Sequence, residues 1–243
     1  MKPSKLSKSG RLIAACSVAV LAAAASPANA ELFNFSSGGL SGTANITPGD
    51  GTVSVVLTNT TASITSIAQL LSDVSFSVSG GGTIGSTQTA VPTGSLYTCA
   101  NGTGCTAASG SANAWYYGMN GTVGSQGDLG GGDYILTALV GSSRSLILST
   151  AGLGMNCNPK CPDGLSNTVN QPYLAPSGSF SLSIPGVTTD SDISHVVLSF
   201  GTAPETVIPI PAAVWLFGSG LVGLIGIARR RIASSSAPTP AFA

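Results

Sequence analysis

The chain has 243 residues, of which 32 are glycine and only 7% are charged. Its nine basic and nine acidic side chains cancel over the whole chain, but residues 31–206 hold all nine acids and only two bases, which gives that part a net charge of −7. This charge makes nucleic acid a poor partner, because phosphates are bound by Lys and Arg, and the abundance of glycine with little Lys or Glu argues against a helical domain.

Residues 1–30 are predicted to be a signal peptide. Four basic residues are followed by an uncharged, mostly apolar stretch and then by a helix-breaking proline. Ala28 and Ala30 supply the small-x-small pattern that signal peptidase recognises. We therefore expect cleavage after Ala30, which makes Glu31 the first residue of the mature chain. A lipoprotein cleavage site at Cys16 is the alternative, although the uncharged stretch continues nine residues beyond it.

Residues 31–206 are predicted to form one β-rich domain, since their number suffices for one hydrophobic core and is too small to expect two. Short alternating or continuous apolar stretches predict strands, and turn sequences rich in Gly, Pro and Asp separate them. The predicted strands are 52–58, 73–79, 134–140, 145–150, 180–184 and 195–200. The pattern predicts an all-β fold, an antiparallel β-sandwich.

Two further predictions concern single segments of this domain. In 73–79 the apolar residues at 74, 76 and 78 are expected to point into the core, and the serines between them toward solvent. A two-turn helix is expected in 63–71, because apolar residues follow Ile64 at i+3, i+4 and i+7 and Ser63 can cap the N-terminus.

The predicted domain contains an even number of cysteines: Cys99, Cys105, Cys157 and Cys161. In an exported domain this indicates disulfides. Of the three pairings we favour the local one, Cys99–Cys105 with Cys157–Cys161, in which each bond closes a short loop and contributes about 2 kcal/mol. A zinc site is the alternative, but the spacings are not those of a typical zinc knuckle. All four cysteines lie in long loops, 79–113 and 151–178, whose length suggests function.

The densest aromatic cluster is Trp115, Tyr116 and Tyr117. Exposed aromatic rings stack on sugar faces, so these three residues are candidates for carbohydrate binding. The alternative is a strand with one face in the core.

Carboxylates in two turns are candidates for calcium, which prefers several oxygen ligands. They are Asp190 with Asp192, and the loop 128–133, although neither matches a known calcium-loop motif. His195 is the only histidine, which excludes a His-rich metal site. Because no Gly-x-Ser-x-Gly nucleophile elbow accompanies it, we expect no enzymatic activity, no catalytic residue and no cofactor other than calcium.

Near the C-terminus, residues 212–228 form a run of 17 residues without a charge. As a helix this run is about 26 Å long, close to the thickness of a bilayer core. Arg229, Arg230 and Arg231 follow directly and place the 232–243 tail in the cytoplasm by the positive-inside rule. We therefore expect one transmembrane helix with the domain outside.

Two prolines precede this helix and disfavour helical conformation before it, so the lead-in 207–210 is expected to be extended. The order of a short Pro-x-Pro motif, an apolar helix and an arginine cluster resembles a PEP-CTERM sorting signal of the VPLPA type. The resemblance covers residues 207–231 and extends weakly back to 193. The matching motif residues are Ile208, Pro209, Ile210, Pro211 and Ala212.

The resemblance implies cleavage near the motif by an exosortase, a membrane enzyme of Gram-negative bacteria. It also implies delivery to the cell surface or extracellular matrix and an association with exopolysaccharide and biofilm. The expected partners are signal peptidase, the exosortase-like enzyme, the inner membrane during transit and an extracellular polysaccharide. The alternative function is a secreted carbohydrate-binding module that uses the aromatic cluster.

Overall fold

The structure is a computed structural model of the chain, and it describes residues 30–123, 132–202 and 206–208. The strands are β1 (Glu31–Ser37), β2 (Leu40–Gly49), β3 (Thr52–Asn59), β4 (Leu71–Val78), β5 (Gln88–Ala90), β6 (Leu96–Ala100), β7 (Gly104–Ala108), β8 (Trp115–Met119), β9 (Tyr134–Thr137), β10 (Tyr173–Leu174), β11 (Ser177–Ser183), β12 (Ile193–Phe200) and β13 (Thr206–Ile208). The helical segments of the described part are short: η1 (Ile67–Gln69), α1 (Thr150–Leu153) and η2 (Thr168–Asn170).

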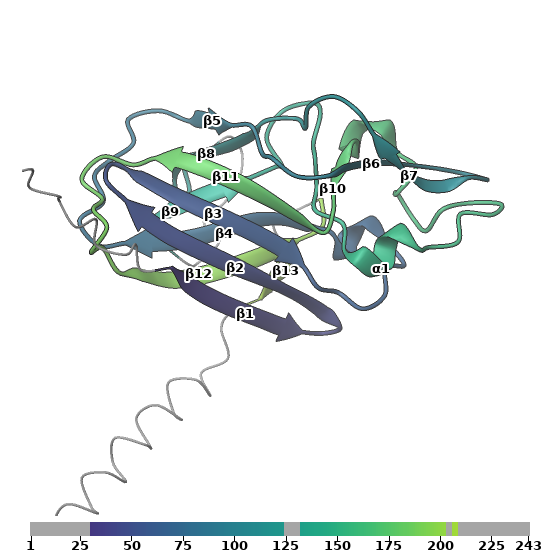
Figure 1. Cartoon of the computed structure of the whole chain (residues 1–243), viewed down its shortest axis with the longest axis horizontal. Helices are drawn as coiled ribbons and strands as arrows, with labels where there is room; N and C mark the ends of the chain where they lie inside the picture. Colours follow the sequence, from purple (N-terminus) through teal and green to yellow (C-terminus); the bar gives the residue numbers. More distant parts are fainter. Residues whose placement is uncertain (1–29, 124–131, 203–205, 209–243) are drawn as a thin grey trace, which may run out of the picture.

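The strands form two main antiparallel sheets that face each other, which agrees with the predicted β-sandwich (Figure 1). One sheet has the order β1-β2-β3-β11, and the other has the order β13-β12-β4-β9-β8-β5. A third, small sheet of β10, β6 and β7 lies at one end of the sandwich, beside α1. The chain crosses repeatedly between the sheets, so sequence neighbours such as β3 and β4 lie in different layers.

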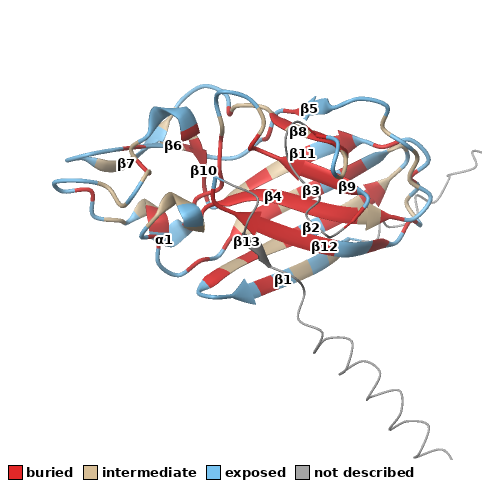
Figure 2. Ribbon diagram, turned by 180° about the vertical axis from the view of Figure 1, so that it is seen from behind, coloured by how far each residue is buried: buried red, intermediate tan, exposed pale blue. Residues whose placement is uncertain are grey.

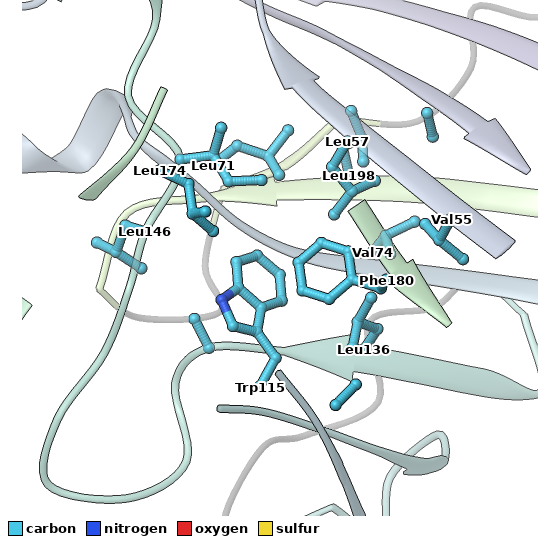
Figure 3. Close-up of a cluster of buried hydrophobic side chains, with 14 of the residues drawn as sticks. Val55, Leu57, Leu71, Val74, Trp115, Leu136, Leu146, Leu174, Phe180 and Leu198 are labelled. Atoms are coloured by element: carbon cyan, nitrogen blue, oxygen red, sulfur yellow. The ribbon is translucent and has the colours of Figure 1, made fainter. Parts of the chain in front are cut away.

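The core lies between the two main sheets, where alternate residues of each strand point inward. Val53, Val55 and Leu57 of β3 are fully buried and face the second sheet. Phe180 of β11 packs there against Trp115 of β8, as Figure 3 shows. The predicted strands at 52–58, 180–184 and 195–200 correspond to β3, β11 and β12 and are confirmed within a few residues at each end.

The prediction that the serines of 73–79 face solvent was wrong for Ser75. Val74, Phe76 and Val78 are buried as expected, but Ser75 is also fully buried. Its hydroxyl accepts a hydrogen bond from the backbone N–H of Gly132. β4 is a central strand between β12 and β9, and chain segments cover both of its faces.

The predicted two-turn helix at 63–71 was also wrong. The described segment contains only the 3-10 turn η1, which is capped by Ser66 rather than by Ser63. The side-chain oxygen of Gln69 accepts hydrogen bonds from the backbone N–H groups of Thr65 and Ser66. Leu71 then begins β4 and forms a bridge with Ile147. Burial of this end of the segment therefore outweighs the helical spacing of its apolar residues.

Residues 145–149 are buried, but they form isolated bridges at Ile147 instead of the predicted strand, and exposed Thr150 begins α1. Ile147 bridges Leu71 on one side and Leu174 on the other, and Ser149 caps α1. The strand predicted at 134–140 ends early, at Thr137, because the Thr137 hydroxyl accepts a hydrogen bond of 2.9 Å from the backbone N–H of Leu139 and turns the chain.

Candidate functional site

The aromatic cluster does not form an exposed platform. Trp115 is fully buried, and its indole Nε1 donates a hydrogen bond of 2.8 Å to the carbonyl oxygen of Ser145. Its ring lies 4.7 Å from that of Phe180, centroid to centroid. Tyr117 is buried too, and its hydroxyl accepts a hydrogen bond from the backbone N–H of Ser183. The prediction that these two residues bind sugar was wrong, because a buried ring presents no face to a ligand.

Tyr116 points to the other face of β8 and is half-buried. It packs against a small cluster formed by Val123 and Ile135. Strand alternation thus separates Tyr116 from Trp115 and Tyr117, so the three rings cannot act together on one ligand.

The predicted local disulfides are both present, Cys99–Cys105 across the β6–β7 hairpin and Cys157–Cys161 in the loop after α1. These four cysteines are therefore not free to bind zinc. Backbone contacts join the two loops: the N–H of Gly102 donates to the carbonyl of Cys157, and the N–H of Cys161 donates to Oδ1 of Asn101. The disulfide loops form one lobe, which projects from the end of the sandwich (Figure 2).

Gln171 joins the two chain segments of this lobe. Its side-chain oxygen accepts from the N–H of Cys99, and its Nε2 donates to the carbonyls of Cys99 and Leu165. The hydroxyl of buried Tyr173 also donates to Leu165, and desolvation raises the pKa of this tyrosine. Gln171 is not among the predicted site residues, since nothing in its local sequence distinguishes it from other polar loop residues.

Removal of the Cys99–Cys105 bond is expected to loosen the lobe and leave the sandwich folded. The double variant Cys99→Ser/Cys105→Ser loses about 2 kcal/mol of stability, because the closed loop is short. Hydrogen exchange should accelerate only in residues 94–110 and 151–172. Faster exchange in β3 or β4 would contradict this. The Cys157→Ser/Cys161→Ser variant, whose bond lies in the same lobe, should also leave exchange in β3 and β4 unchanged.

The calcium candidates are dispersed. Asp190 and Asp192 are exposed near the start of β12, and the N–H of Asp192 donates to the Ser79 hydroxyl. Residue 128 lies outside the described residues, whereas Asp133 pairs through its backbone N–H with Ser77. In the described part of the chain, no three metal-ligating side chains gather. Calcium binding stays an untested prediction.

His195 lies within β12, at an irregularity in its pairing with β4 between Ser194 and Val197. Its φ angle is 49°, the one positive value at a non-glycine residue of the described chain. The imidazole is exposed and lies 3.2 Å from the Ser194 hydroxyl. The bulge therefore turns the histidine outward, away from the core.

Asp73 is a buried carboxyl group that sequence analysis did not identify. It lies in β4, fully buried between Thr137 of β9 and Ser199 of β12. Its Oδ2 accepts a hydrogen bond of 2.6 Å from the Ser72 hydroxyl, but its Oδ1 has no partner. Desolvation raises the pKa of Asp73 from 3.8 to about 6, although nearby hydroxyls and the charge of Arg144 oppose the rise. The sequence signal for it is that Asp73 is the one charged residue of a strand that otherwise contains only apolar residues and serine.

Strands mark both ends of the described domain. β1 begins at Glu31, the expected first residue of the mature chain, and the Glu31 carboxylate accepts a hydrogen bond of 3.1 Å from the N–H of Ile193. β13 pairs with β12 through Ile208, two residues past the predicted domain boundary. The other motif residues, the predicted membrane helix, the arginine cluster and the tail lie outside the described residues. Within the described ranges no helix is long and apolar enough to span a membrane.

Fold and disulfides together define an antiparallel β-sandwich domain with a disulfide-bonded lobe. The chain matches no protein-family profile, no curated protein and no solved structure.

Proposed function

We propose that this protein is an exported, non-enzymatic surface or extracellular-matrix protein of a Gram-negative bacterium. An exosortase-type enzyme cuts it near the Ile208–Ala212 motif and releases the β-sandwich from its transient anchor in the inner membrane. Outside the cell the domain associates with exopolysaccharide. The observation that carries this proposal is the C-terminal order of Pro-x-Pro motif, apolar segment and arginine cluster.

Two features of the structure support the proposal. Both cysteine pairs are bonded, and disulfides persist in oxidising compartments outside the cytoplasm. β1 also begins directly after Ala30, the expected signal-peptidase site, and β13 ends at Ile208, the first residue of the motif. We expect cleavage at either position to leave the core of the sandwich intact.

The test is mass spectrometry of the mature protein from cells that express the full chain together with an exosortase. We expect a new C-terminus near the motif, and at least tenfold less processed product for Pro209→Ala/Pro211→Ala. Pro185→Ala, which alters an exposed turn of the domain, is the matched control and should be processed normally. A mature protein that still ends at Ala243 in the presence of the enzyme would refute the proposal.

A further inference from the structure

The outer face of the β1-β2-β3-β11 sheet has an unusual composition. The outward side chains are every second residue within 32–36, 41–47, 52–58 and 177–183, and Figure 1 looks onto the face that they form. All of them are Ser, Thr or Asn, apart from Leu32 and Val56. No charged residue stands among them, whereas charged residues make up about a quarter of an ordinary domain.

These side chains are available to a ligand. Each is exposed or half-buried, and in the described part of the chain none of their hydroxyl or amide groups hydrogen-bonds to another residue. Two charged residues lie at the margins of the sheet: Glu31 is bound to the Ile193 backbone, and Asp50 lies in the β2–β3 turn. The other charged residues that the structure describes lie outside these four strands.

Strand register places the outward groups in rows across the sheet. One row consists of Asn34, Thr43, Thr58 and Ser177. A second row, parallel to it, consists of Leu32, Asn45, Val56 and Ser179, and a third consists of Thr47, Ser54 and Ser181. With strands about 5 Å apart and like-facing residues about 7 Å apart along each strand, the groups form a regular grid.

We propose that this face, which we call the hydroxyl face, binds a neutral polysaccharide chain. The inference rests on the proposed function and specifies its partner and its surface. A Ser or Thr hydroxyl both donates and accepts and rotates freely, which matches sugar hydroxyls that do the same. Leu32 and Val56 offer small apolar contacts to the C–H faces of sugar rings.

Charge decides between the candidate partners. An acidic polymer would meet a domain of net charge −7 and no cation on the hydroxyl face, so it would be repelled. A second copy of the domain carries the same net charge, and two hydroxyl-rich faces bury too little apolar area to overcome that repulsion. A neutral polymer is not repelled by the domain's charge, and its repeating hydroxyls can hydrogen-bond to the rows of hydroxyl and amide groups.

The experiment is a binding assay with the full chain in a zwitterionic detergent, since sugar-headed detergents would compete. The probes are insoluble cellulose, curdlan and amylose as neutral polymers, with alginate beads as the acidic one. We expect binding to at least one neutral polymer that persists in 1 M NaCl. Asn45→Asp and Ser54→Glu should each weaken it at least tenfold, because the new carboxylate loses water without gaining a partner.

Thr89→Glu is the matched control, since it adds the same charge to an exposed threonine of β5 in the other sheet. It should bind normally, and circular dichroism of all three variants checks their folding. Absence of binding to every neutral polymer, salt-sensitive binding to alginate alone, or equal binding by Asn45→Asp would each overturn the proposal. So would a dimer that Asn45→Asp dissociates. Neutral-polymer binding together with an unprocessed C-terminus would refute the proposed function alone.

Discussion

Asp73→Asn is expected to stabilise the folded protein at pH 7.5 and to change its stability little at pH 4. The Asp73 carboxyl has no solvent contact, and only one of its oxygens accepts a hydrogen bond. Burial raises its pKa from the ordinary 3.8 to about 6. Folding therefore takes up a proton between these two pH values.

The sign follows from this proton uptake. The contribution of Asp73 to stability is complete below pH 3.8 and is lost as the pH rises through 6. The full difference amounts to about 3 kcal/mol. Since Asn cannot ionise, the variant keeps at pH 7.5 the stability that the parent protein has only in acid.

Urea unfolding between pH 4 and pH 7.5 measures the effect. Asp190→Asn removes an exposed carboxylate and is the control, with an expected change within about 0.5 kcal/mol at both pH values. A gain of the same size for Asp73→Asn at pH 4 and at pH 7.5 would contradict the role of ionisation. An equal gain at both pH values would mean that packing alone, and not ionisation of Asp73, explains the change in stability.

Trp115→Ala is expected to cost about 3–5 kcal/mol of folding free energy, as is typical when a fully buried large aromatic residue is truncated. The indole fills the space between β8 and Phe180 of the opposite sheet, and it also satisfies the Ser145 carbonyl. Its loss leaves a cavity and an unpaired acceptor in the core.

Chemical denaturation of the two variants Trp115→Ala and Tyr116→Ala separates a core role from a binding role. Tyr116 is half-buried on the opposite face of β8, so its truncation should cost less than that of Trp115. Polysaccharide binding per folded molecule should be the same for both variants and for the parent protein. Loss of binding in Trp115→Ala with unchanged stability would return the aromatic cluster to consideration as a sugar site.

The sequence indicates the hydroxyl face in part. The alternation of Ser and Thr with apolar residues in 52–58 and 177–183 indicates sheet strands with one polar side. The pairing of these strands, and with it the continuity of the charge-free rows, depends on contacts between residues more than a hundred positions apart. Such contacts leave no local pattern.

Local chemistry in the sequence determined the β class, the position of β3, β11 and β12, and the pairing of cysteines four and six residues apart. Each of these depends on residues close together in the chain. Only the tertiary structure decided that Trp115 and Tyr117 are core residues, that Ser75 and Asp73 are buried, and that 145–150 forms bridges. Alternation shows which side chains share a face of a strand, but whether that face is covered depends on distant segments that pack against it.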